Sequence, residues 1–376
     1  MTACLVTAAN TAWNIVNFRA GLISQLKHAG FDVVVAVPPD SSYSERMAAL
    51  GVEQIDVELD RSGLNPFADV SLFFKYWKVL RRLRPAAFLS FTIKPNIYGC
   101  LAARILGIPA IANVSGLGTA FSERSWLRRL ATNLYRVALK RAHVFFQNAD
   151  DMREFVEDRI VLRQNAQVLP GSGIDLKEFV PEPLPDGGPI FLLVARLLVG
   201  KGVREFVAAA QEVRREFPDA RFRLLGPVDE GNPTAIKRDE LDSWIAEGVI
   251  EYLGVREDVR GEIAKASVMV LPSFYREGVP RSLLEGAAMA RPLISTDTPG
   301  CRELVVETAG GLACAPRDVS SLVDAMRKIA RMSATERTRM GLAARSLVEE
   351  RFSEERVVHA YLAALASAGV RRRSLV

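Results

Sequence analysis

The sequence predicts an α/β protein built from two doubly wound parallel sheets, each covered by helices on both faces. Three observations support this fold class. The chain has 376 residues, enough for two domains that each bury a core. Short apolar runs alternate with segments of helical periodicity, which is the pattern of βαβ units. Between residues 180 and 189, four prolines and two glycines interrupt the alternation and predict a linker.

The expected elements follow in order along the chain. In the first domain, residues 1–180, we expect strands at 3–9, 32–38, 52–59, 86–91, 108–114, 143–148 and 166–170, with helices at 16–29, 67–83, 95–106 and 125–140. In the second, residues 181–354, we expect strands at 190–196, 220–226, 249–254, 267–273 and 292–296, with helices at 203–216 and from 281. Ligands bind outside the carboxyl ends of such strands, which predicts a cleft between the two sheets.

Composition narrows the class of protein. With 49% hydrophobic and 25% charged residues, the chain is typical of a globular protein. No apolar run approaches the roughly 18 residues of a bilayer-spanning helix, and the N-terminus does not resemble a signal peptide. The cysteines are too far apart for a paired redox or zinc motif and predict reduced thiols, as in the cytosol: Cys4, Cys100, Cys301 and Cys314.

The net charge of +5 is distributed unevenly along the chain. Residues 75–141 contain thirteen basic residues and one acidic residue, Glu123, whereas the rest of the chain is slightly acidic. A local excess of this size attracts a polyanion: nucleic acid, an anionic membrane surface or a phosphorylated substrate.

Two glutamates flank a predicted helix start in the second domain. Glu277 lies in the loop after the strand 267–273, and Glu285 lies two turns into the next helix. Between them, Gly278 permits close approach to the backbone and Pro280 suits a first helical turn. Helix N-termini bind phosphate oxygens, and carboxylates accept hydrogen bonds from sugar hydroxyls. On this pair alone a solvated surface loop is the favoured explanation, because two glutamates eight residues apart are common.

Two cations follow the first strand of the second domain. Arg196 and Lys201 lie at its carboxyl end, with Gly200 and Gly202 on either side of the lysine. Fixed cations at such an edge stabilise a diphosphate leaving group where no metal does so. Either cation alone is explained as an ordinary surface charge, but the two together with the glycines favour a nucleotide-diphosphate site.

Four segments together resemble the family 4 glycosyltransferases of the GT-B fold: ARLLVGKG (195–202), YLGVREDV (252–259), residues 270–304 and PGSGIDLKEF (170–179). The resemblance covers essentially the whole chain. It implies two Rossmann-like domains facing across a cleft, an N-terminal one for the acceptor and a C-terminal one for the nucleotide sugar. A C-terminal helix of about 355–376 is expected to pack back on the first domain. Segments such as SFTIKPNIYG further resemble bacterial enzymes that extend polyprenyl-diphosphate-linked glycans.

The resemblance implies roles for the matching residues. Glu277 approaches the donor sugar, while Arg196 and Lys201 hold the diphosphate, and these three are the expected catalytic residues. Glu285 holds the ribose, and Arg256 lies near the base. The other expected donor-binding residues begin the helix: Gly278, Val279 and Pro280.

The chain departs from the family pattern in its first domain. Many relatives have a glycine pair after the first strand, but this chain does not, so Asn14 is our candidate for the phosphate contact there. Where many relatives have a histidine after the fourth strand, this chain has Thr92, Ile93 and Lys94.

The resemblance also implies retention of configuration at the anomeric carbon. Because no residue is well supported as a carboxylate nucleophile, we expect front-face attack in which a departing phosphate oxygen takes the acceptor proton. No metal-ligand spacing and no Asp-x-Asp motif is present, so no cofactor and no divalent ion is expected. The preferred donor is a UDP-linked N-acetylhexosamine or hexose, with GDP-mannose next.

The basic stretch predicts a site for the acceptor or for an anionic membrane. The helix 67–83 has apolar side chains around most of its surface, with Tyr76 and Trp77 typical of a membrane interface. In the helix 125–140, apolar residues including Leu130 and Val137 form one arc opposite the arginines, which core packing explains equally well. We therefore expect a cytoplasmic protein attached peripherally to the inner face of the cell membrane through some of these residues: Lys75, Lys78, Arg81, Arg82, Arg84, Lys94, Trp126, Arg128 and Arg129.

Other functions explain less of the sequence. A sugar-nucleotide epimerase of the same architecture needs acid and base groups at the sugar, and the chain has only three histidines. A nucleic-acid-binding protein fits the basic stretch but leaves the arginine, lysine and glutamate arrangement unexplained, and no nucleic-acid-binding motif is present. A Rossmann dehydrogenase is disfavoured because no G-x-G-x-x-G follows an early strand.

Overall fold

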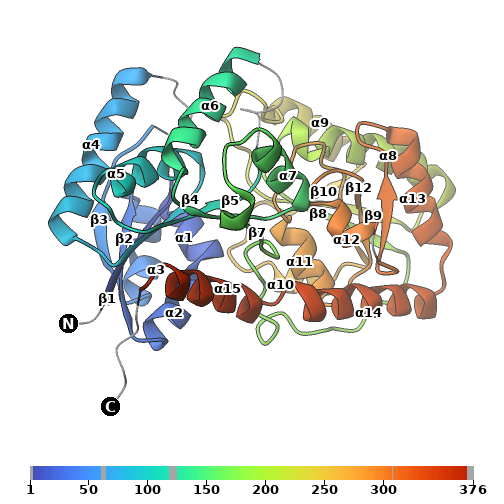
Figure 1. Ribbon diagram of the computed structural model, residues 1–376. Helices are drawn as coiled ribbons and strands as arrows, with labels where there is room; N and C mark the ends of the chain where they lie inside the picture. The colour runs from blue at the N-terminus through green and yellow to red at the C-terminus, as the bar shows by residue number, and fades with distance from the viewer. Residues whose placement is uncertain (1–2, 61–64, 118–124, 307, 371–376) are drawn as a thin grey trace. The chain divides into compact units, whose positions relative to one another are not determined.

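The structure, a computed structural model, describes residues 3–60, 65–117, 125–306 and 308–370, and the side chains of 125–127 are not described (Figure 1). Its contacts divide the chain into two compact units, Met1–Gly173 with Glu354–Val376, and Ile174–Ser353. The expected boundary was at 180/181, but Ile174 already pairs with Ser353, and its amide donates to the carbonyl of Phe352 at 2.9 Å.

The first unit contains a seven-stranded parallel sheet of order β3-β2-β1-β4-β5-β6-β7. Its strands are β1 (Ala3–Ala8), β2 (Phe31–Val37), β3 (Glu53–Asp56), β4 (Ala87–Phe91), β5 (Ala110–Val114), β6 (His143–Phe146) and β7 (Ala166–Val168). Strand order reverses between the neighbours β1 and β4, where Ala8 lies opposite Ser90. The carboxyl ends of these two strands are therefore the topological switch point of the sheet, where doubly wound proteins bind ligands.

Helices cover both faces of this sheet. The helices α4 (Pro66–Leu83), α5 (Cys100–Ile105), α6 (Ser125–Ala138) and α7 (Ala149–Glu157) share one apolar cluster with it. The opposite face is covered by α1 (Ala12–Phe18), α2 (Ala20–His28), α3 (Ser44–Ala49) and α15 (Glu354–Ser367). The helix α15, from the end of the chain, packs beside α2 in this unit (Figure 1).

The predicted helix 16–29 is instead two helices. The hydroxyl of Thr11 accepts a hydrogen bond from the amide of Asn14, so α1 begins at Ala12. It ends at Arg19, whose side chain is buried with its guanidinium carbon 4.1 Å from the centroid of the Phe91 ring. The sequence pattern did not indicate this break because the partner of Arg19 is distant in the chain.

One prediction about the surface of α4 is wrong, and the structure decides which side of α6 faces the core. Tyr76 is fully buried and lies edge-to-face against Phe88, with ring centroids 5.9 Å apart, because it shares the inner face of α4 with Leu72 and Leu80. On α6 the core side is Ala131, Tyr135 and Ala138. Leu130 and Val137, in the arc for which core packing was one of two explanations, are 48% and 50% exposed.

The second unit contains a six-stranded parallel sheet of order β10-β9-β8-β11-β12-β13. Its strands are β8 (Ile190–Val194), β9 (Arg221–Leu225), β10 (Glu251–Tyr252), β11 (Val268–Leu271), β12 (Leu293–Thr296) and β13 (Gly311–Cys314). Its helices are α8 (Val203–Glu216), α9 (Arg238–Ala246), α10 (Arg260–Ala264), α11 (Arg281–Ala288), α12 (Arg302–Val305), α13 (Val319–Arg331) and α14 (Ala334–Arg351). The switch point of this sheet lies between β8 and β11.

The proline-rich stretch predicted as a linker is held on the second unit. The fully buried guanidinium of Arg291 donates hydrogen bonds to the carbonyls of Glu182, at 2.7 Å, and of Pro183, at 3.1 Å. It also donates to the carbonyl of Ala266 at 3.2 Å. These bonds explain why the chain already belongs to the second unit before β8.

Among the helices that the structure describes, none combines the length and the apolar character that crossing a bilayer requires.

Candidate active site

The loops after β8 and β11 meet at the switch point of the second sheet. Because β8 and β11 are parallel neighbours, their carboxyl ends lie at the same edge. The carbonyl of Gly200, after β8, accepts a hydrogen bond from the amide of Phe274 at 3.0 Å and lies 3.1 Å from the hydroxyl oxygen of Ser273, both after β11. The backbones of the two loops are therefore hydrogen-bonded to each other, independently of their functional side chains.

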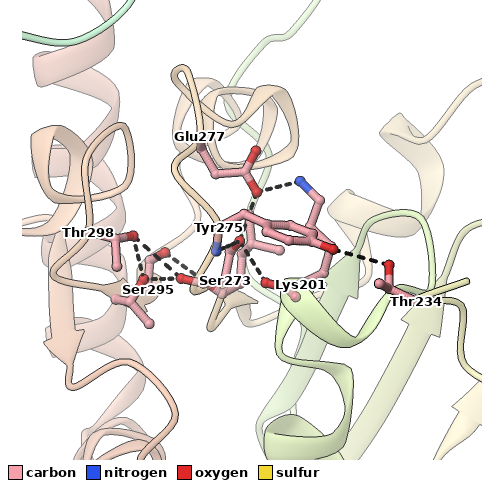
Figure 2. A network of polar contacts seen from close by, with 10 residues as sticks. Lys201, Thr234, Ser273, Tyr275, Glu277, Ser295 and Thr298 are labelled. Atoms are coloured by element: carbon pink, nitrogen blue, oxygen red, sulfur yellow. Dashed lines mark hydrogen bonds and ion pairs between the residues drawn. The ribbon is translucent and has the colours of Figure 1, made fainter. Parts of the chain in front are cut away.

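A lysine and a glutamate from these two loops form an ion pair. The Nζ atom of Lys201 lies 2.5 Å from Oε1 of Glu277, and the two side chains are 17% and 15% exposed (Figure 2). The hydroxyl of the fully buried Ser273 donates to the same carboxylate oxygen at 2.7 Å. A partly buried pair is screened less by solvent than a surface pair, so this contact orients the carboxylate of Glu277.

Small residues allow this close approach. Gly200 lies against the ring of Tyr275, where any Cβ atom would overlap the ring, and the hydroxyl of Tyr275 lies 3.1 Å from that of Thr234 (Figure 2). Gly300 has a φ of 86°, and a Cβ atom there would overlap the carbonyl of Gly278. The absence of side chains at Gly200 and Gly300 therefore lets the neighbouring loops pack closely against residues 275–278.

Sequence reasoning missed Ser273, Tyr275 and Gly300. The serine and glycine were visible in the segments PSFYREG and DTPGC, but only the folded loops show which atoms they contact.

The other predicted donor residues of this unit do not join the Lys201 pair directly. An Nη atom of Arg196 lies 3.1 Å from the carboxylate of Asp229, in the loop after β9, and the Arg196 side chain is 51% exposed. Arg256 is exposed, and its guanidinium donates to the carbonyl of Val255 at 3.1 Å. The amide-bearing turn before α11 is buried: Gly278, Val279 and Pro280.

Glu285 lies on α11 with its side chain largely buried. Its carboxylate accepts a hydrogen bond from Nε of Arg281 at 3.0 Å, and its side chain is 13% exposed. Burial raises the pKa of Glu285, whereas the charge of Arg281 acts in the opposite direction.

The predicted acceptor and membrane residues belong to the first unit. Lys94 lies 2.9 Å from Asp69, and Lys75 lies 3.4 Å from Glu58. Arg128 contacts Glu154 at 2.8 Å. The remaining basic side chains are exposed: Lys78, Arg81, Arg82, Arg84 and Arg129. The side chain of Trp126 lies outside the described residues.

Asn14, the candidate for the N-terminal phosphate contact, lies in the first turn of α1. Its side-chain oxygen Oδ1 is buried and has no hydrogen-bond partner among the described residues. Within the part of the chain that the structure describes, no group of three or more histidine, cysteine, aspartate or glutamate side chains could hold a metal ion.

Comparisons with known proteins identify the family. Residues 15–171 match the glycosyl transferase 4-like domain, and residues 188–332 match the glycosyl transferases group 1. Over 348 residues the chain is 32% identical to the N,N'-diacetylbacillosaminyl-diphospho-undecaprenol alpha-1,3-N-acetylgalactosaminyltransferase of Campylobacter jejuni, a match that covers 88% of this chain and 89% of that protein. The chain belongs to the family 4 glycosyltransferases. It is therefore an enzyme that transfers a sugar.

Further relatives agree with this family. The glycosyltransferase is 23% identical over 276 residues to the UDP-Gal:alpha-D-GlcNAc-diphosphoundecaprenol alpha-1,3-galactosyltransferase of Escherichia coli, covering 69% of this chain and 70% of that one. The crystal structure of Anabaena HepE in complex with UDP-glucose is similar with a TM-score of 0.79 at 15% identity, covering 97% of this chain and 100% of that one. This likeness confirms the predicted GT-B fold with two Rossmann-like halves.

The contact between Ser273 and Glu277 makes a testable prediction. The substitution Ser273→Ala removes the hydroxyl that holds the carboxylate, and hydrogen bonds to charged groups contribute about 1.5–3 kcal/mol. We expect kcat for sugar transfer to fall about tenfold to a hundredfold, measured in steady-state assays. The control is Ser295→Ala, because the buried hydroxyl of Ser295 donates instead to the carbonyl of Leu271. Equal losses in the two variants would contradict a specific effect on Glu277.

Proposed function

We propose that this glycosyltransferase is a retaining, metal-independent enzyme acting in bacterial surface-polysaccharide or glycan assembly. It transfers an N-acetylhexosamine or hexose from a UDP-linked donor to a polyprenyl-diphosphate-linked glycan. The observation that supports the chemistry is the pairing of Lys201 with a Glu277 carboxylate that Ser273 also holds. The names of the Campylobacter jejuni and Escherichia coli relatives support the choice of acceptor.

The proposed donor site depends on exchange of ion-pair partners. Without donor, Glu277 balances the charge of Lys201, and Asp229 balances that of Arg196. A nucleotide diphosphate has more negative charge than either carboxylate and competes with them for the two cations. Lys201 and Arg196 then stabilise the charge that develops on the leaving phosphate oxygen.

Glu277 orients the donor sugar in this proposal. Without donor, Lys201 and Ser273 both hold its carboxylate; once Lys201 has moved to the diphosphate, the hydroxyl of Ser273 still positions it as an acceptor for sugar hydroxyls. The bond between the anomeric carbon and the phosphate oxygen breaks, and the acceptor hydroxyl bonds to the same face of that carbon. The proton of the hydroxyl moves to the departing phosphate oxygen. No metal ion takes part in this route.

The helix α11 completes the proposed donor site. The turn before α11 brings the backbone amides of Gly278 and Val279 to the phosphates, Pro280 begins the helix without an amide hydrogen, and the carboxylate of Glu285 accepts hydrogen bonds from the ribose. Arg256, exposed in the loop after β10, is proposed to lie near the base, and Asn14 of the first unit is proposed to contact the phosphates.

Substitution of Lys201 tests this donor site. Lys201→Ala should lower kcat by about a hundredfold or more with an unchanged KM for acceptor, because the lost cation acts on the leaving group. The matched control is Lys265→Ala, whose lysine forms an exposed pair with Glu262 in the same unit. The identity of the donor is determined from the rise in melting temperature with UDP, GDP and their sugars. Unchanged turnover in Lys201→Ala would contradict the proposed role, and a shift with GDP-mannose alone would identify a mannosyltransferase.

An anionic membrane surface is the second proposed partner. The helices α4 and α6 pack on the same face of the first sheet and leave apolar side chains outside. On α4, Phe67 is 86%, Val70 55% and Phe74 57% exposed, at positions that share one helix face. Exposed basic residues follow at the end of α4: Lys78, Arg81, Arg82 and Arg84. Apolar side chains beside basic ones are typical of peripheral helices at anionic lipid, and we propose attachment at the inner face of the cell membrane.

Vesicle binding tests this attachment. Replacing both Phe67 and Phe74 with serine should reduce flotation with anionic vesicles at least tenfold, because burial of each ring in lipid contributes about 1.5–3 kcal/mol. Neutralising Arg81, Arg82 and Arg84 should weaken binding to anionic vesicles further. Leu342→Ser, at a half-exposed position of α14, is the control and should bind as the wild type does. Undiminished flotation of the double variant would exclude this surface.

A further inference from the structure

The backbone is strained where β4 ends. Thr92 has a φ of 72°, a conformation that a β-branched residue rarely adopts. The other described non-glycine residues with positive φ lie after helix ends or in a turn, where that conformation is ordinary: Arg84, Arg159, Ala290 and Arg317. Such strain costs about 1–3 kcal/mol and persists at sites where the surrounding structure enforces it.

A buried polar network enforces the conformation of Thr92. The amide of Asn96 donates to the carbonyl of Thr92 at 3.0 Å. The Asn96 side chain accepts from the hydroxyl of Ser90 at 2.8 Å and donates to the carbonyl of Asn113 at 2.8 Å, and all three residues are almost fully buried. Residues Pro95–Gly99 form a π-helical turn, a rare geometry that is frequent at functional sites.

This strained turn lies at the switch point of the first sheet. Ala8 of β1 lies opposite Ser90 of β4, so the loops that follow leave the sheet side by side. Beyond each strand lies a buried side-chain oxygen without a hydrogen-bond partner among the described residues: Oγ1 of Thr92 after β4, and Oδ1 of Asn14 in the first turn of α1, after β1. Polar atoms of this kind at a switch point indicate that a ligand belongs there.

Directly after Thr92, three side chains form a compact polar cluster. The Nζ atom of Lys94 lies 2.9 Å from Oδ1 of Asp69, and the hydroxyl of Tyr98 donates to Oδ2 of Asp69 at 2.8 Å. The side chains of Lys94 and Asp69 are 12% and 18% exposed, so the cluster is partly buried yet open to solvent. Burial and the hydrogen bond to Asp69 raise the pKa of Tyr98, which keeps its hydroxyl protonated.

We infer that Asp69, Lys94 and Tyr98, together with Thr92, bind the hydroxyl groups of a sugar in the acceptor. The inference rests on the proposed function and assigns the sugar-binding part of its acceptor site. The charges of Lys94 and Asp69 balance each other while the two are paired, so a neutral hydroxyl can bind beside them without separating the pair, which a phosphate would have to do. A carboxylate beside an ammonium group and a phenol offers both acceptors and donors to neutral hydroxyls.

The position of the cluster agrees with a lipid-linked acceptor. Asp69 lies in the first turn of α4, between the exposed Phe67 and Val70. An acceptor whose lipid lies in a membrane against that face would bring its head group close to Asp69. Lys94 is therefore still proposed to bind the acceptor, but it contacts the sugar and does so together with Asp69.

The variant Asp69→Asn tests the assignment, because it keeps the shape of the side chain and removes its charge. We expect KM for GlcNAc-diphospho-undecaprenol in detergent micelles to rise at least tenfold, with an unchanged KM for the donor. Inhibition by farnesyl diphosphate, which has the diphosphate but no sugar, should stay the same. The matched control is Glu58→Gln, which removes the carboxylate beside a different lysine, Lys75 of α4, and should leave both constants unchanged.

A second variant, Tyr98→Phe, removes one donor to Asp69 without changing any charge and should raise the acceptor KM by a smaller factor. It also tests the assignment if Asp69→Asn fails to fold. Tighter inhibition of Asp69→Asn by farnesyl diphosphate would show that Lys94 binds phosphate and would overturn the inference. If the wild type transfers sugar to this acceptor and both variants keep its acceptor KM, the inference is overturned as well. A wild-type enzyme that binds nucleotide sugar but transfers to no polyprenyl-diphosphate glycan would refute the proposed function first, and the inference with it.

Discussion

The ion pair between Lys201 and Glu277 is the interaction on which the rest of the second unit's site depends. It joins the loop after β8 to the loop after β11, and Ser273 and Gly200 bring those loops close enough for it to form. The pair occupies the lysine while no donor is bound. In the proposed mechanism, Lys201 pairs with Glu277 until the nucleotide binds. Lys201 then contacts the diphosphate, and Glu277 contacts the donor sugar.

The first unit uses the same position in its own sheet differently. Its switch point has a strained threonine and a cluster in which Lys94 and Tyr98 both contact Asp69, whereas in the second unit Lys201, after β8, pairs with Glu277, after β11. Two sheets of similar topology thus present different chemistry at equivalent edges. The proposed reaction uses this difference, because its donor is an anion and its acceptor is a hydroxyl group.

The candidate residues of the second unit could be chosen from the sequence because they lie in short segments. Glycines beside Lys201 and the spacing from Glu277 to Glu285 are local signals, and each follows a strand that periodicity identifies. Local signals could not show that Ser273 holds Glu277 or that Asp229 balances Arg196, since these partners meet only when strands pair. For the same reason Lys94 was predicted without Asp69, which lies 25 residues earlier in the chain. Tyr76 was placed at a membrane because its pattern along α4 does not reveal that Phe88 packs against it.

The central claim is that Lys201 exchanges Glu277 for the donor's diphosphate, and calorimetric titration of UDP tests it most directly. UDP has the diphosphate but no sugar, so Glu277 can only compete with it. The account predicts that Glu277→Gln binds UDP about tenfold more tightly than the wild type, because Lys201 is released, while Lys201→Ala binds it more weakly. Equal or weaker binding of UDP by Glu277→Gln would contradict the exchange.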